Sequence, residues 1–186
     1  RLDAALRGAG SLVVAYSGGV DSAFLLHRAH AVLGDACLGV IADSPSLPRA
    51  ELREALALAE RMRVRVEVVR TREFENPEYV ANPVNRCYFC KSALFVELEQ
   101  LAREWGFRRL AYGENADDMA QVRPGRAAAG EFEVLAPLRD AGLTKQEIRA
   151  ASAAAGLEVA DKPASPCLSS RIPHGTAVTL EALGRV

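Results

Sequence analysis

The stretch AYSGGVDSAFLLH, residues 15–27, decides the fold. It follows the apolar run LVVAY at 12–16 and leads into an apolar segment that suits a helix, so its centre, SGGVDS at 17–22, is a strand-to-helix turn. Glycine tolerates unusual backbone conformations, and the first N–H groups of a helix have no partner within it. This combination binds phosphate. A plain tight turn is the alternative, but it would explain one glycine and not both serines.

Hydrophobic periodicity extends the pattern on both sides of this loop. It predicts strands over 12–16, 37–42, 64–69, 109–112 and 134–135, and helices over 21–33, 48–62, 92–105 and 145–155. Strands that alternate with helices predict an α/β fold with a doubly wound, mainly parallel five-stranded sheet, whose ligands lie at the carboxyl ends of the strands. Residues 1–160 form this domain, and 161–186 are an irregular segment rich in Pro, Ser and Gly.

Composition limits the classes of function. The chain has 186 residues, 49% of them hydrophobic, and a formal net charge of −1, so nothing in its overall charge favours nucleic acid as a partner. The first ten residues lack the pattern of a signal peptide, and no apolar run approaches the roughly 20 residues of a membrane span. We expect a cytoplasmic protein without a membrane partner, in which paired thiols bind metal or do redox work.

Acidic residues follow two of the expected strands. Asp43 lies where a doubly wound fold places adenine or ribose, although it could instead cap the turn before Pro45. In LAYGENADDMAQVRPG, 110–125, Gly113 ends a strand and Asp117 and Asp118 follow it. Carboxylates beside a phosphate site suit magnesium, so we expect Gly113 at the nucleotide and Asp118 near the metal. The alternative is that the two aspartates only complement a helix N-terminus.

Lysine is rare in this chain. Only Lys91, Lys145 and Lys162 occur among 23 basic residues, so each one calls for an individual explanation. Lys145 begins an expected helix, where the helix dipole disfavours a cation. A bound anion would remove this conflict, and we expect Lys145 to contact phosphate.

The cysteines divide into one buried and three chemical candidates. Cys37 lies in an apolar strand and is expected to pack as a small hydrophobic residue. Cys87 and Cys90, in NRCYFCK, and Cys167, in DKPASPCLSSRIPHGT, fall in expected loops at the ligand face. With His174, these three would form a zinc site, and alone they would hold a [4Fe-4S] cluster with one open iron. The third alternative is that the CxxC pair is merely two half-buried thiols.

The loop at 17–22 resembles that of the PP-loop ATP pyrophosphatases, an adenine nucleotide alpha hydrolase-like superfamily that splits ATP into AMP and pyrophosphate. The resemblance implies that the phosphates of ATP are held by Ser17, Gly18, Gly19, Asp21 and Ser22, with Asp21 next to Mg²⁺. It is not a Walker A loop, because no Gly-Lys-Ser/Thr follows the glycines. GLTKQEIR is similar to the Leu-x-Lys-x-x-x-Arg element of related enzymes, which implies that Lys145 contacts pyrophosphate.

A closer resemblance covers nearly the whole chain. SGGVDS, NRCYFCK, YGENADD, RPG, GLTKQEIR and DKPASPCLSSRIPHGT occur in the order seen in the LarE family of ATP-dependent sulfur transferases. The resemblance implies that carboxylates of pyridinium-3,5-biscarboxylic acid mononucleotide are adenylated and become thiocarboxylates of the nickel-pincer cofactor of lactate racemase. Some members sacrifice the sulfur of one cysteine, which corresponds to Cys167. Others relay sulfide through a [4Fe-4S] cluster, and Cys87, Cys90 and Cys167 imply this cluster type.

The resemblance also implies the remaining parts of the site. Asp21, Lys145 and Cys167 are the expected catalytic residues. Arg123 and Arg171 are expected to bind the substrate's phosphate or carboxylates through their guanidinium forks, with surface solvation as the alternative. The donor is sulfide or another sulfur source.

Two departures from the family pattern bear on these expectations. Position 174 is His where the family more often has Tyr, and the family continues into a C-terminal domain, cut short here, that helps to build a homo-oligomer. A PP-loop tRNA thiolase with an iron-sulfur cluster is the rival enzyme, although it would require a basic RNA-binding surface. A non-catalytic ATP-binding module with a structural zinc is the third alternative.

Overall fold

Parallel strands form the centre of the computed structural model, which describes residues 1–186. The sheet has the order β3-β2-β1-β4, and every neighbouring pair is parallel. Its strands are β1 (Leu12–Ala15), β2 (Cys37–Asp43), β3 (Val66–Arg70) and β4 (Arg109–Tyr112). The chain builds outward from β1 to β3 and then returns to the other side of β1. The strand order therefore reverses between β1 and β4, the place where open α/β sheets bind ligands.

The predicted fifth strand at 134–135 is wrong. This segment forms a single parallel bridge between Leu135 and Ala111. The Leu135 N–H donates to the carbonyl of Leu110 at 2.9 Å, and the Tyr112 N–H donates to the carbonyl of Leu135 at 3.0 Å. Pro137, which has no N–H, then begins helix α7 (Pro137–Asp140), so the segment cannot continue along β4.

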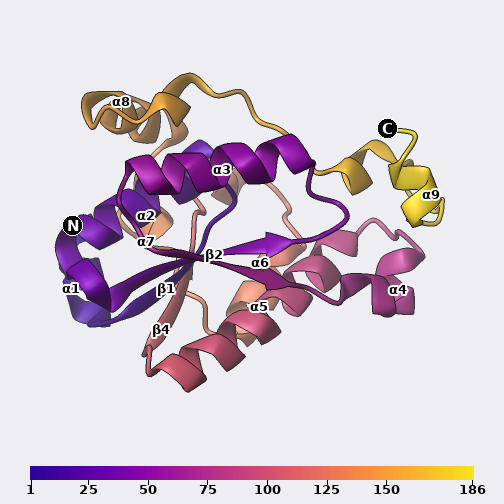
Figure 1. Ribbon diagram of the computed structural model, residues 1–186, viewed down its shortest axis with the longest axis horizontal. Helices are drawn as coiled ribbons and strands as arrows, with labels where there is room; N and C mark the ends of the chain where they lie inside the picture. The colour runs from indigo at the N-terminus through magenta and orange to yellow at the C-terminus, as the bar shows by residue number, and fades with distance from the viewer.

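Helices cover both faces of the sheet (Figure 1). One face carries α1 (Leu2–Ala9), α2 (Val20–Leu33), α3 (Arg49–Arg61) and α8 (Lys145–Ala154), and the other carries α5 (Arg86–Trp105) and α6 (Gly125–Glu131). Side chains along β1 alternate between these layers, because Leu12 and Val14 join one core and Val13 the other. None of the helices combines the length and apolar composition that a membrane crossing requires.

The helix predicted over 92–105 begins earlier, at Arg86. Cys87 and Cys90 therefore lie among the first five residues of α5, and the expectation that they sit in a loop is wrong. Cys87 is exposed, whereas Cys90 is partly buried. Since residues three apart lie on neighbouring positions of a helix surface, the turn fixes how far apart the two thiols can move.

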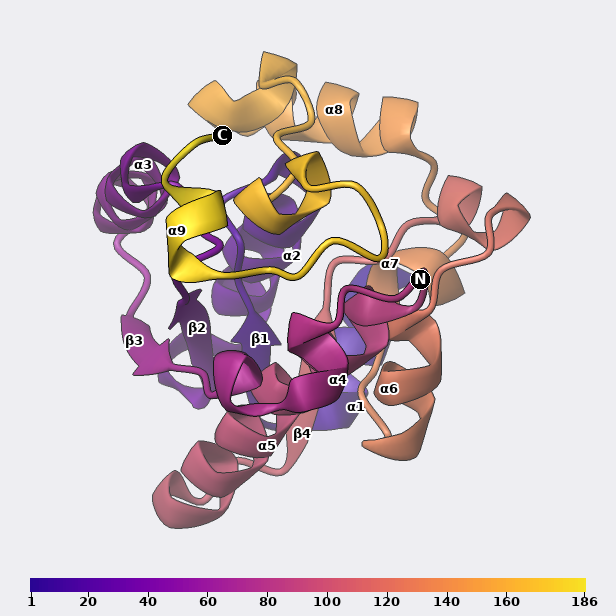
Figure 2. The same cartoon turned by 90° about the vertical axis from the view of Figure 1, so that its right-hand side faces the viewer.

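The C-terminal segment crosses the carboxyl ends of the strands. Figures 1 and 2 show it running from α8 past α3 to lie beside α4 (Pro77–Val80), ending in α9 (Leu180–Leu183). A separate apolar cluster fixes it there through Tyr79, Ile172, Val178 and Leu183. Residues 161–186 are irregular as predicted, apart from the turn Leu168–Arg171 and the four-residue helix α9. The domain division at residue 160 stays a prediction.

Candidate functional site

Two serine hydroxyls hold the loop between β1 and α2. The Ser22 hydroxyl accepts from the Ser17 N–H at 3.1 Å, lies 3.0 Å from the Ser17 hydroxyl and donates to the Gly19 carbonyl at 3.1 Å. Gly18 has φ 76°, and a Cβ there would lie 2.6 Å from Cβ of Ala55 on α3. Only glycine fits this position. The loop thus presents the unpaired N–H groups of a 14-residue helix toward the end of β1.

The end of β4 lies directly against this loop. A Cβ on Gly113 would come within 2.7 Å of the Ser22 nitrogen and 2.9 Å of its Cα. Because both atoms belong to the backbone, they cannot move aside as a side chain can. Gly113 therefore has a packing role at the switch point, and its expected contact with nucleotide stays a prediction.

Asp21 is the charged centre of the site. Its Oδ2 lies 2.7 Å from Nζ of Lys145 and accepts from the Asn115 amide at 3.2 Å. Its Oδ1 is buried and has no hydrogen-bond partner. Leaving a buried polar atom unsatisfied is costly, and carboxylate oxygen is a ligand that Mg²⁺ prefers, so this atom fits a bound cation.

The start of α8 brings Lys145 to this position. Thr144 caps the helix by accepting from the Glu147 N–H, and the Glu147 carboxylate bonds back to the Thr144 N–H at 2.8 Å. The Lys145 N–H donates to Oδ2 of Asp117 at 2.8 Å. Thr144 is therefore the N-cap of α8. Two carboxylates, those of Asp21 and Asp117, offset the unfavourable placement of a lysine at a helix N-terminus.

Asp118 and Arg123 form a pair at the other side of the loop. Oδ2 of Asp118 accepts from the Asn115 N–H at 3.1 Å, in a capping box, and Oδ1 lies 2.6 Å from the Arg123 guanidinium. Both carboxylate oxygens expected near magnesium thus have protein partners. The roles predicted for Asp118 and Arg123 stay predictions, but in this arrangement each would have to release the other to bind a ligand.

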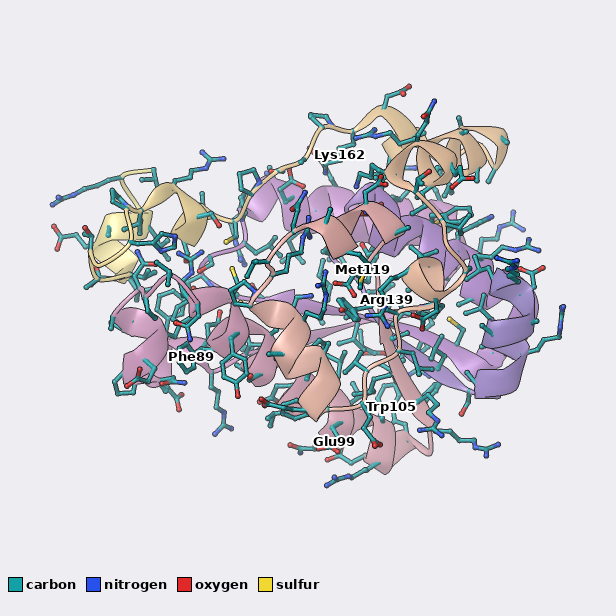
Figure 3. All side chains as sticks on the ribbon, turned by 180° about the vertical axis from the view of Figure 1, so that it is seen from behind. Phe89, Glu99, Trp105, Met119, Arg139 and Lys162 are labelled. Atoms are coloured by element: carbon teal, nitrogen blue, oxygen red, sulfur yellow. The ribbon has the colours of Figure 1, made fainter.

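Glu114 is a buried carboxylate that the sequence did not assign. It is 3% exposed and accepts hydrogen bonds from Arg126 at 2.8 Å, Arg139 at 2.8 Å and the Tyr112 hydroxyl at 2.7 Å. Burial raises the pKa of Glu114, but these three donors outweigh it and hold the pKa below its ordinary value. Figure 3 shows the partly exposed Arg139 near the turn that carries Met119. Glu114 therefore anchors the turn after β4.

Asp43, predicted to contact nucleotide, pairs with Arg49. The Arg49 guanidinium also donates to the carbonyls of Ser44 at 2.6 Å and Leu47 at 2.8 Å. These bonds hold the turn between β2 and α3, which is the structural alternative for Asp43. Its contact with adenine or ribose stays a prediction.

The three candidate thiols lie near one another without forming a metal centre. Burial raises the pKa of Cys90 to about 12, with further increases from the charges of Glu73, Cys167 and Cys87. No group of three or more His, Cys, Asp or Glu side chains, however, is placed so that it could hold a metal ion. His174 is exposed, so the structure brings together neither the zinc set nor the iron-sulfur set expected from the sequence.

Arg171, Cys37 and Lys91 differ in how far they are exposed to solvent. Arg171 is exposed at the end of the turn Leu168–Arg171. Cys37 is buried in β2, which confirms the packing role predicted for it, and burial raises its pKa to about 12. Lys91 was not assigned from the sequence. Its ammonium lies 4.1 Å from the centre of the Tyr112 ring, and burial lowers its pKa. The rarity of lysine was the one signal that pointed to it.

Two cavities lie away from these residues. They measure about 190 and 430 Å³, and Arg109, at the amino end of β4, lines both. Neither borders the loop after β1. The candidate site is therefore the open edge at the carboxyl ends of β1 and β4.

Comparisons with known proteins agree with this geometry. No model of a protein family matches the chain. Over 174 residues it is 46% identical to an uncharacterized protein of Synechocystis sp., a match that covers 94% of this chain and 65% of that protein. It is 31% identical over 187 residues to pyridinium-3,5-bisthiocarboxylic acid mononucleotide synthase of Lactiplantibacillus plantarum, covering 100% of this chain and 67% of that enzyme. The chain thus spans about two thirds of the length of these relatives.

A solved structure supports the fold independently. NMN synthetase from Francisella tularensis superposes with a TM-score of 0.67 at 19% sequence identity, over 88% of this chain and 71% of that one. At this identity the likeness bears on the fold alone. It agrees with an α/β fold built on a parallel sheet.

Proposed function

The chain belongs to the family of pyridinium-3,5-bisthiocarboxylic acid mononucleotide synthase, and we propose that it is the catalytic part of an ATP-dependent sulfur transferase. The proposed substrate is pyridinium-3,5-biscarboxylic acid mononucleotide, whose carboxylates become thiocarboxylates of the nickel-pincer cofactor. The observation that carries the proposal is the Asp21–Lys145 pair, with its unsatisfied carboxylate oxygen, beside a phosphate-binding loop. Cytoplasmic location and a homo-oligomer belong to the same proposal.

The first step activates the carboxylate. Its oxygen attacks the α-phosphorus of ATP, the bond to the β-phosphate oxygen breaks, and pyrophosphate leaves. The N–H groups at the start of α2 and the ammonium of Lys145 would bind phosphate oxygens. Asp21 would hold magnesium, which would neutralise phosphate charge. Adenylation makes AMP the leaving group, so a sulfur nucleophile can then displace it.

The second step delivers sulfur. Cys87, Cys90 and Cys167 would be the thiolate ligands of a [4Fe-4S] cluster, which would supply sulfide to the activated carboxylate. The role of the chain is to bring these thiols to the edge where the acyl adenylate forms. Arg171, Arg123 and Lys91 are the cations proposed to bind the anionic substrate.

The spacing of the ligands favours a second candidate mode. Because the three cysteines do not group around a common point, Cys167 could itself supply the sulfur. Its Sγ would attack the activated carbonyl and AMP would leave. Loss of the Cα proton would then break the Cβ–Sγ bond, giving the thiocarboxylate and a dehydroalanine at position 167.

Anaerobic purification tests these proposals together. The full-length protein should contain iron and acid-labile sulfide, which Cys87→Ala, Cys90→Ala or Cys167→Ala should remove and Cys37→Ala should not. Turnover with the proposed substrate should release AMP and pyrophosphate, and release of ADP would contradict the PP-loop assignment. Protein without iron that loses the mass of H₂S at position 167 during turnover would establish the sacrificial mode.

A further inference from the structure

Arg86 is a buried arginine that connects the two cysteine-bearing segments. It is 3% exposed and directly precedes Cys87 at the start of α5. Its guanidinium donates to the Asn82 side-chain oxygen at 2.8 Å, the Ser169 carbonyl at 2.6 Å and the Ser170 hydroxyl at 3.2 Å. None of these acceptors is a carboxylate. The buried guanidinium of Arg86 therefore holds a turn that lies 83 residues away in the chain.

The turn that Arg86 holds is the one that begins at Cys167. The Ser170 hydroxyl lies 3.2 Å from Sγ of Cys167, and the Ser170 N–H donates to the Cys167 carbonyl at 3.0 Å. A continuous series of polar contacts thus runs from the guanidinium through Ser170 to the Cys167 thiol. The other end of the same side chain is anchored in the helical turn that carries Cys87 and Cys90.

We propose that Arg86 is a positioning residue for sulfur transfer, which sets the place of the Cys167 thiol relative to the CxxC turn of α5. The inference rests on the proposed role of Cys167. Two nitrogens of one planar fork reach two acceptors in the same turn, Ser169 and Ser170. The single ammonium of a lysine cannot make both bonds in this geometry, so charge without the fork does not suffice.

A purely structural role is the competing explanation, and the chain provides a matched control for it. The Tyr79 hydroxyl lies 2.8 Å from the Ser169 hydroxyl and 2.7 Å from that of Ser46. Tyr79→Phe removes the hydrogen bond to the Ser169 hydroxyl in the same turn. It leaves the polar contacts from Arg86 through Ser170 to Cys167 in place. If any loosening of the C-terminal segment displaced the thiol, this variant would behave like Arg86→Lys.

The test measures thiol proximity in the full-length protein, free of metal and substrate. Dibromobimane, which bridges two neighbouring thiols, is applied anaerobically, and the bridged peptides are identified by mass spectrometry. The yield of bridges from Cys167 to Cys87 or Cys90 is divided by the yield of the Cys87–Cys90 bridge. This ratio is internally controlled, because Cys87 and Cys90 share one helical turn that Arg86 substitutions leave in place.

The expected ratio falls about tenfold in Arg86→Lys, as loss of a charge-assisted hydrogen bond implies, and falls in Ser170→Ala as well. Tyr79→Phe should keep the wild-type ratio. A wild-type ratio in Arg86→Lys, an equal loss in Tyr79→Phe, or no Cys167 bridge in the wild type would each overturn the proposal. If Arg86→Lys does not fold, Ser170→Ala decides. Failure to load iron would contradict the cluster and leave this result standing.

Discussion

Lys145 and Asp21 form a salt bridge of 2.7 Å, although 124 residues separate them in the chain. Lys145 is the first residue of α8, and Asp21 lies in the first turn of α2. Two helix N-termini and a lysine ammonium thus meet at one carboxylate where β1 ends. Both helix ends attract negative charge, so the site is arranged for a polyanion accompanied by a cation.

Removing the ammonium of Lys145 should slow the adenylation step. Lys145→Gln is expected to lower the rate of pyrophosphate release by about 100-fold, because it removes a donor from the charge that develops on the departing phosphates. Its stability should change by less than about 1 kcal/mol, since the pair is partly exposed. Arg103→Gln, which breaks an exposed pair with Glu99, is the control. A normal rate in Lys145→Gln would exclude it from the phosphate site.

The unpaired oxygen of Asp21 should be a magnesium ligand. Asp21→Asn removes the negative charge and should raise the magnesium concentration needed for half-maximal AMP formation by about tenfold or more. Magnesium titrations at fixed ATP would measure this. A variant with unchanged magnesium dependence but a lower rate would show that Asp21 acts only through Lys145.

Gly113 should be irreplaceable for steric reasons. Gly113→Ala places a Cβ against the backbone of Ser22 and is expected to destabilise the fold by about 1–3 kcal/mol and to weaken ATP binding. Gly130, in α6, has open space around it, and Gly130→Ala should stabilise by about 0.5–1 kcal/mol. Urea unfolding and calorimetric ATP titration would distinguish the two variants. Equal effects would contradict the close approach of β4 to α2.

The attachment of the cysteine-bearing segment to α3 should depend on pH. Lys162, visible in Figure 3 between α8 and the C-terminal segment, lies 2.6 Å from Glu51 and 2.9 Å from Glu54. The bond from Lys162 lowers the pKa of Glu51. Burial lowers the pKa of Lys162, but its two carboxylate partners outweigh this and raise it.

The sign of the effect follows from these directions. A lowered pKa of Glu51 stabilises the fold above its ordinary value of 4.5, and this stabilisation is lost as the pH falls through the folded-state pKa. A raised pKa of Lys162 stabilises the fold below the ordinary value of 10.5, and this stabilisation is lost as the pH rises through the folded-state pKa. Lys162→Met should therefore cost about 0.5–1 kcal/mol near neutral pH and almost nothing in strong acid. Thermal unfolding of both proteins across pH 2–9 is the measurement, and a pH-independent difference would contradict the ion pair.

Thiol reactivity should follow burial in the metal-free protein. Cys87 is exposed, whereas the pKa of both Cys90 and Cys37 is raised to about 12. Since the thiolate is the nucleophile, iodoacetamide near pH 8 should modify Cys87 well before Cys90 and Cys37. Time-resolved peptide mass spectrometry gives the order. Faster modification of Cys90 than of Cys87 would show that the first turn of α5 opens in solution.

Local signals predicted the strand, the loop and the helix around residues 17–22 well. β4 occupies the residues expected for it, Ser17, Gly18 and Gly19 lie between β1 and α2, and Ser22 lies in the first turn of α2. The missing strand at 134–135 could not be distinguished from a real one, because a single bridge and a strand share the same apolar residues. The pairing of this segment with β4 ends after one bridge because Pro137 begins helix α7.

The arrangement of the segments that carry Cys87, Cys90 and Cys167 was less predictable. The CxxC pair was expected in a loop ahead of the helix predicted over 92–105, but the helix begins earlier, at Arg86. Two partners of Arg86, Ser169 and Ser170, lie in the C-terminal segment, and no sequence periodicity connects that segment with the start of α5. Likewise, the capping box that occupies Asp118 has the same composition as a metal-binding acidic pair, and only the geometry separates them.

The bond between Arg86 and the Ser169 carbonyl also sets an order of assembly. During synthesis, N-terminal parts of a chain emerge and fold first. The loop after β1, the end of β4 and Lys145 are all made before residue 169 leaves the ribosome, so the ATP-binding half can be complete while the third thiol still has no place. If the proposed function holds, a nascent chain that has reached Lys145 but not residue 169 would carry the activating residues before its third thiol is in place.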